Sequence, residues 1–204
     1  MISFLFVGAV CAADTDEEAF KTAVKQGTDL FFAGKVREAI ASYDAAAERY
    51  PDRAAQLWQR GIACYYAGDH ARGIQQFAEH RTVNPDDVEN AVWHFLCTAK
   101  ADSPVTAKKN LIPVSDDDRV PMKELHAFYA GTGSEADVFR AADDTNASDT
   151  DRQKRRFYAH LYIGLYYDAL GKDTAKQHLK IAAGYGYPFF MGRMAVLHVK
   201  LRGW

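Results

Sequence analysis

The fold is decided by two consecutive stretches of sequence, FKTAVKQGTDLFFAGKVREAIASYDAAAERYP (residues 20–51) and AAQLWQRGIACYYAGDHARGIQQFAEHRTVNP (residues 54–85). Aligned with an offset of 34 residues, they place the same kinds of residue at the same positions. The matching pairs are Gly27 and Gly61, Gly34 and Gly68, Ala39 and Gly73, Tyr43 and Phe77, and Pro51 and Pro85. Self-similarity at a fixed period of this length is typical of proteins built from stacked repeats.

The repeated positions predict a helical hairpin. In the first helix, Gly27 and Gly61 allow a partner helix to pack closely, and Gly34 and Gly68 end the helix in a tight turn. The second helix combines a small residue with an aromatic residue four positions later, on the same face. We expect each proline to begin the next unit at the first position of a helix, where its missing N–H costs little.

The rest of the chain is helical but less regular. A third hairpin is predicted near the carboxyl end, since Gly164, Tyr167 and Gly171 keep the internal spacing of the first helix, and Ala175, Leu179 and Ala182 follow one residue early. Between the hairpins, helices are expected over residues 89–100, 121–130 and 135–142, and an exposed loop over residues 143–151. Residues 189–204 are expected to form a helix that caps the last hydrophobic face of the stack.

Composition fits a folded helical protein. Hydrophobic residues make up 48% of the 204 positions and charged residues 25%, which excludes wholesale disorder. A formal net charge of −2 gives no basic face for a nucleic acid. Cys64 and Cys97 fall near the same phase of successive first helices, whose axes should lie about 8–10 Å apart, so we expect buried thiols and no disulfide.

The amino terminus predicts export. Residues 2–10 form an apolar run that is too short for a membrane span of about 20 residues. Small residues follow and then an acidic start, which is the layout of a signal peptide over residues 1–13, cleaved after Ala12 or Ala13. A misplaced start codon or a short buried helix remains an alternative, because no basic residue precedes the run. Val10 is too bulky to precede a lipidated cysteine, so we expect no lipid anchor at Cys11.

These observations divide the chain into four parts: a signal peptide (1–13), two repeat units (14–87), irregular helical hairpins (88–150), and a third unit with a capping helix (151–204). The recurring glycine, small, aromatic and proline positions, with Ala46 as a second small residue, resemble the tetratricopeptide repeat (TPR). Ala23 and Leu57 stand at that family's tryptophan position. The resemblance implies an all-α solenoid of stacked antiparallel helix pairs, wound as a right-handed superhelix with a C-terminal capping helix.

The TPR resemblance also implies a site. In that architecture the first helices of successive units line a concave wall, and the inward positions map to Thr28, Phe31, Phe32, Trp58, Ile62, Tyr65, Tyr66, Glu89 and Val92. We predict a groove for a partner segment at Phe31, Phe32, Trp58, Ile62, Tyr65, Tyr66 and Glu89, because large aromatic side chains anchor peptides. Half of these rings are expected in the core, with Phe31, Trp58 and Tyr65 exposed.

The whole layout is similar to the NlpI-like bacterial envelope lipoprotein adaptors, on the segments 89–97, 119–131 and 162–171. That resemblance implies a non-catalytic, dimerising scaffold that brings envelope hydrolases to a protease.

Three function hypotheses follow. The first is a non-catalytic TPR adaptor that binds a protein or peptide and needs no cofactor. The second is a homodimer that associates through Phe189, Phe190, Met191 and Trp204. The third is a metal-dependent enzyme with His94 and His126 as ligands, although the sequence carries no catalytic motif.

Overall fold

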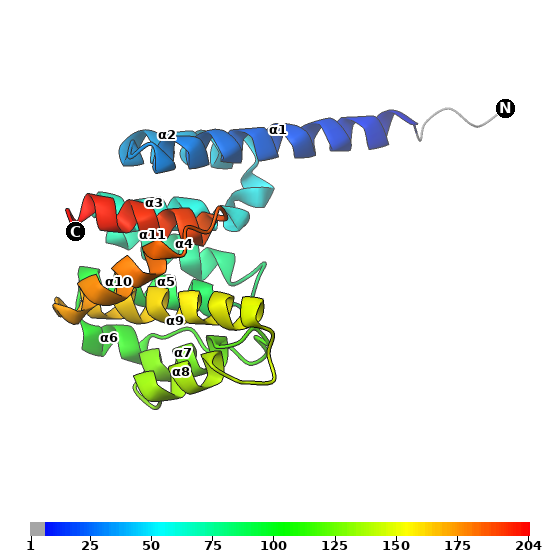
Figure 1. Ribbon diagram of the computed structural model, residues 1–204. Coiled ribbons are helices and arrows are strands. Elements are labelled where there is room, and N and C mark those ends of the chain that lie inside the picture. The colour runs from blue at the N-terminus through cyan, green and yellow to red at the C-terminus, as the bar shows by residue number, and fades with distance from the viewer. Residues whose placement is uncertain (1–6) are drawn as a thin grey trace.

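The computed structural model describes the backbone of residues 7–204 and the side chains of residues 16–204. In this part of the chain the structure is helical and contains no strand, so the prediction of an all-α protein is confirmed (Figure 1). The elements are α1 (Val7–Phe32), α2 (Val36–Arg49), η1 (Pro51–Gln56), α3 (Trp58–Ala67), α4 (His70–His80), α5 (Val88–Ala101), α6 (Pro104–Lys109), α7 (Met122–Ala130), α8 (Glu135–Ala142), α9 (Asp149–Ala169), α10 (Thr174–Gly184) and α11 (Phe190–Leu201).

The first two hairpins, α1–α2 and α3–α4, use the repeated glycines as the sequence predicts. A Cβ atom on Gly27 would lie 2.5 Å from Cε1 of Tyr43, and one on Gly61 would lie 2.6 Å from Cζ of Phe77. We call these two glycine–aromatic contacts the hairpin seams. Gly34 and Gly68 end the first helices with φ angles of 80° and 79°, in the left-handed region that glycine adopts without strain. The 34-residue offset is therefore the spacing between two equivalent glycine–aromatic contacts, one in each hairpin.

The third hairpin, α9–α10, repeats the geometry without the aromatic ring. Gly171 has φ 67° in the connecting turn, and a Cβ atom on Gly164 would lie 2.7 Å from Cγ of Leu179. Leucine thus fills the position that tyrosine and phenylalanine fill in the first two hairpins.

Helices α5, α7 and α8 lie within one residue of their predicted bounds, but other boundaries were wrong. Pro51 begins the 3₁₀ helix η1, and Pro85 lies in a turn before α5, so neither proline starts an α-helix. Helix α9 begins at Asp149, inside the predicted loop, because the Ser148 hydroxyl accepts from the backbone N–H of Asp151 and caps it. Helix α6 was not predicted.

The C-terminal helix α11 packs mainly against α10, the second helix of the third hairpin, and also contacts α1. The ring of Phe190 stacks on Phe31 of α1 at a centroid distance of 5.8 Å and lies 4.7 Å from the ring of Trp58 of α3. Through this ring α11 also reaches the first two hairpins. The physical reason is that α1 and α3 present aromatic rings away from their seams, and α11 covers that apolar surface.

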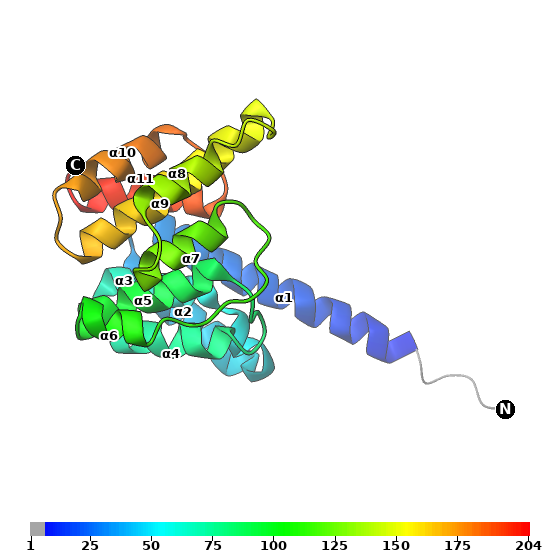
Figure 2. The ribbon, with the colours of Figure 1, turned by 90° about the horizontal axis from the view of Figure 1, so that it is seen from below.

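Helix α1 is continuous from Val7, through the predicted cleavage point, to Phe32, and its first half projects from the rest of the molecule in Figures 1 and 2. Residues 1–6 of the predicted signal peptide lie outside the described residues. No described helix is both long enough and apolar enough to cross a membrane.

The two internal cysteines are buried free thiols, as predicted. Burial raises the pKa of Cys64 to about 11 and raises the pKa of Cys97 further, which keeps both sulfur atoms protonated and unreactive.

Candidate functional site: an aromatic cavity

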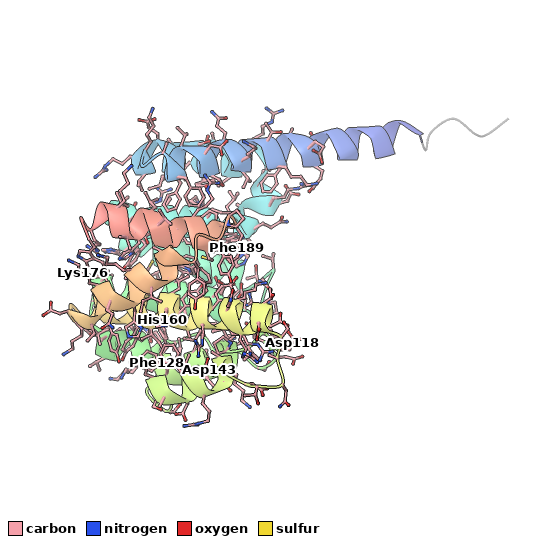
Figure 3. All side chains as sticks on the ribbon, viewed as in Figure 1. Asp118, Phe128, Asp143, His160, Lys176 and Phe189 are labelled. Atoms are coloured by element: carbon pink, nitrogen blue, oxygen red, sulfur yellow. The ribbon has the colours of Figure 1, made fainter. Side chains whose placement is uncertain are left out.

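A cavity of about 220 Å³ lies where α3, α4, α5, α9 and the start of α11 meet. Phe189, labelled in Figure 3, lines it at the turn into α11, with its ring 6.1 Å from that of Tyr158 on α9. We call this space the aromatic cavity. Its lining residues are Trp58, Phe77, His80, Asp87, Glu89, Asn90, Trp93, Tyr158, Phe189, Phe190 and Met191.

Aromatic rings supply most of the wall. Trp58 meets Phe190 edge to face at 4.7 Å, and Phe77 lies nearly parallel to Trp93 at 6.5 Å. The arrangement holds each ring by at least one aromatic neighbour, so the wall is rigid. Ring faces carry partial negative charge, which suits them to contact a cation.

Two buried polar atoms at the cavity have no hydrogen-bond partner. Asn90 is 4% exposed, and its Nδ2 donates to the backbone carbonyl of Phe77 at 3.0 Å, which leaves Oδ1 unpaired. Trp93 is 1% exposed, and its Nε1 is also unpaired. An unsatisfied buried polar group costs about 1–3 kcal/mol, and both atoms have almost no accessible surface, so they lie behind the cavity wall and do not face its interior.

A third polar group comes from α4. Nδ1 of His80 lies 2.8 Å from the carbonyl oxygen of Ala55, which can only accept, so Nδ1 carries the proton of this hydrogen bond. In the neutral ring Nε2 is then an acceptor. The cavity wall thus offers more hydrogen-bond acceptors than donors.

Next to the cavity, three carboxylates surround one guanidinium. Arg119 donates to Glu89 at 2.7 Å and to Asp87 and Asp117 at 2.6 Å each. We call Asp87, Glu89, Asp117 and Arg119 the carboxylate cluster. Its formal charge is −2 when all three acids are ionised, and the residues that line the cavity include no lysine or arginine.

Glu89 is the acid most affected by its surroundings. Its side chain is 15% exposed, and it accepts hydrogen bonds from the hydroxyl of Tyr162 on α9 and from Arg119. Burial raises the pKa of Glu89 above its usual value, against the lowering effect of these two partners. A cation in the cavity would stabilise the ionised carboxylate.

Of the seven residues predicted for the groove, Trp58 and Glu89 line the cavity. The expected exposure of Phe31 and Tyr65 was wrong, because they are 1% and 5% exposed. Phe31 is covered by α11 through Phe190, and the ring of Tyr65 packs against Trp93 at 5.5 Å.

Two of the other predicted groove residues, Phe32 and Tyr66, contact α11. Ile62 is fully buried, and so is the inward position Val92. Phe32 is half-buried beneath the guanidinium of Arg193, which lies 3.8 Å from the ring centroid. The hydroxyl of Tyr66 is 2.8 Å from Nδ1 of His198 on α11. Thr28 bonds to the hydroxyl of Tyr43 at 3.0 Å.

The sequence analysis missed Asn90, Trp93, His80 and Tyr158. A signal was present for two of them, because Asn90 and Trp93 are three positions apart on the helix that carries Glu89, and so share one face. Phe189 and Phe190 were noticed but assigned to self-association.

The residues behind the two rival hypotheses are used inside the chain. Phe190 and Met191 pack at the cavity, and the ring of Trp204 lies 5.7 Å from that of His198. Nε2 of His126 is bonded to the carbonyl of Ile112, and His94 is buried. Within the part of the chain whose side chains are described, no three His, Cys, Asp or Glu residues are arranged to hold a metal ion.

Comparison with known proteins gives no family assignment: the chain matches no protein-family model, and no curated protein has a significantly similar sequence.

Proposed function

We propose that this protein is a non-catalytic, TPR-type adaptor that binds a segment of a partner polypeptide at the aromatic cavity. The observation that carries the proposal is the cavity itself, which combines a mostly aromatic wall with the partly exposed carboxylate of Glu89. Aromatic anchors and buried pockets dominate the energetics of peptide recognition.

The TPR-type solenoid is supported by the 34-residue period and by the hairpin seams, which repeat one contact at that period. The place of action that we propose is the bacterial cell envelope, after export. The apolar run at residues 2–10 supports it, and the resemblance to NlpI-like adaptors suggests an envelope hydrolase or protease as the partner.

A peptide-display library selected against the full chain tests this function. Bound peptides should lose about 2 kcal/mol, or roughly thirtyfold in Kd, with Trp58→Ala, measured by calorimetry. The matched control is Val105→Ala on α6, which removes an exposed aliphatic side chain away from the cavity. A library that yields no binder, or binders that ignore Trp58→Ala, would contradict the proposal.

A further inference from the structure

We infer that the aromatic cavity takes a single cationic side chain of the partner segment, the guanidinium of an arginine or the ammonium of a lysine. This inference rests on the proposed adaptor function, and it names the chemistry that the cavity recognises. Size, hydrogen-bonding capacity, ring faces and charge each point to the same occupant.

The cavity has the volume of one side chain. Pockets for drug-sized molecules have volumes of roughly 300–1,000 Å³. At about 220 Å³ this cavity is smaller, and it accommodates one extended side chain whose backbone stays outside.

The unmatched hydrogen-bonding groups call for a donor-rich guest. Nε2 of His80 accepts when the ring is neutral, and the carboxylate of Glu89, whose side chain is 15% exposed, has further acceptor sites. The hydroxyl of Tyr158 can donate as well as accept. A guanidinium brings five N–H donors and an ammonium brings three, whereas an acidic or aliphatic guest would leave the acceptors of the wall unpaired.

The ring faces and the net charge favour a positive guest. Rings from α3, α5 and α9 and the paired Phe189 and Phe190 surround the space, and a desolvated cation against such faces is favourable. The carboxylate cluster beside it keeps two negative charges after Arg119 is counted. The lining contains no lysine or arginine, and its one histidine is His80.

The charged residues next to the cavity favour a partner segment with a single cationic residue. Lys154 and Arg155 line a neighbouring pocket of about 150 Å³ that shares Tyr158 with the aromatic cavity. Arg119 also lines this pocket and Asp151 is its one acid, so basic side chains predominate there and disfavour a run of basic residues next to the cation.

The first test titrates n-propylguanidinium into the full chain, with uncharged n-propylurea of the same shape as the control. Fluorescence of Trp58 and Trp93 and saturation-transfer NMR report binding, and we expect the guanidinium to bind at least tenfold more tightly than the urea. Glu89→Gln should weaken it several-fold. Glu135→Gln is the matched control, because Glu135 also accepts from a tyrosine hydroxyl, that of Tyr167, outside the cavity.

The second test uses the peptides selected for the adaptor function. Replacing their arginine by citrulline, or their lysine by norleucine, should weaken binding at least tenfold. Circular dichroism of each protein variant shows whether it is folded. If a variant is unfolded, the comparison of charged and uncharged probes on the wild-type protein still tests the inference.

A pH titration gives an independent readout. Glu89 faces Asp87, Arg119, Tyr162 and Tyr158, and its pKa is raised by burial. Binding of n-propylguanidinium to the wild type should weaken as the pH falls through that pKa, and Glu89→Gln should lack this part of the profile.

The outcomes separate the two proposals. If the guanidinium and the urea bind equally, or neither binds, the cationic guest is excluded, and peptides that still depend on Trp58 would leave the adaptor function standing. If n-propylguanidinium binds and no peptide does, a polypeptide is excluded as the source of the cation, and the adaptor function fails with it.

Discussion

Helices α1 and α3 take part both in the hairpin seams and in the face that α11 contacts, but the polar atoms of the two regions differ. In the seams, a glycine meets an aromatic ring, and the hydroxyl of Tyr43 is paired with Thr28. On the face covered by α11, the hydroxyl of Tyr66 lies 2.8 Å from Nδ1 of His198, and Nε2 of His198 is buried without a hydrogen-bond partner.

This difference indicates that the hairpin seams serve stability and that the covered face serves recognition. A seam with no unpaired polar atom gains free energy from packing and needs nothing further. A face with buried, unpaired polar atoms gives up stability that a ligand can restore. Four changes, taken from the largest expected effect to the smallest, test this contrast.

The largest effect is expected from acid on the covered face. Burial lowers the pKa of His198 to about 4 in the folded protein, while in the unfolded chain the pKa of this histidine is about 6.5. As the pH falls from 6.5 to 4, the unfolded state binds this proton and the folded state does not. Stability is therefore full above pH 6.5 and decreases by up to about 3 kcal/mol on the way to pH 4.

Urea denaturation at a series of pH values measures this loss. His198→Asn keeps a polar atom for Tyr66. Below pH 6.5, the free energy of unfolding of this variant should decrease less steeply with falling pH than that of the wild type. If the free energy of unfolding decreased equally steeply with falling pH in the two proteins, His198 would not titrate as its burial requires.

The next effect is expected in a seam. Gly61→Ala places a methyl group 2.6 Å from the ring of Phe77, so overpacking should cost about 1–3 kcal/mol in the free energy of unfolding. Gly184→Ala is the matched control, because no atom lies within 4 Å of its added methyl group. Chemical denaturation should show the control unchanged or more stable, and equal behaviour of the two variants would contradict the seam.

A smaller effect is expected where α11 meets α1 and α3. Phe190→Ala removes a half-buried ring and its contacts with Phe31 and Trp58, which should cost about 1–2 kcal/mol. Tryptophan emission should also shift to longer wavelength as Trp58 meets water. Val196→Ala, an exposed position on the same helix, is the control, and a loss as large for Val196→Ala would mean that α11 is not held through Phe190.

The smallest effect is expected on the outer surface. Arg140 pairs with Asp137 at 2.7 Å, but its side chain is 73% exposed, so solvent screens the pair. Arg140→Ala should leave the thermal unfolding midpoint unchanged within error. A clear decrease would show that surface charge contributes to stability here and would weaken the contrast between seam and covered face.

Local signals predicted the helices well where they were strong. Ser134 begins α8 through a capping box with Asp137, as its position before an acidic first turn indicates. The glycines Gly34 and Gly68 end their helices where expected. The prolines misled, because a proline is compatible with a turn or a 3₁₀ helix as well as with the start of an α-helix.

For a related reason, only two of the eleven residues that line the candidate site were predicted. Trp58 and Glu89 were found because they occupy repeat positions that face inward. Phe31 and Tyr65 were expected to be exposed. The repeat period indicates which face of its helix a residue occupies, but it does not indicate which other part of the chain packs on that face. His80, Tyr158 and Phe189 come from three other elements and join the cavity only in the folded chain.

The amino-acid sequence by itself determined the 34-residue period, the glycine–aromatic hairpins and the all-helical fold, because those depend on backbone conformation and on contacts between neighbouring helices. Only the tertiary structure decided that α11 folds back over the first two units, buries the predicted groove and leaves an aromatic cavity beside the carboxylate cluster. Contacts between Phe190 and Phe31 join residues that are far apart in the chain, and no local pattern specifies which apolar surface a distant helix will cover.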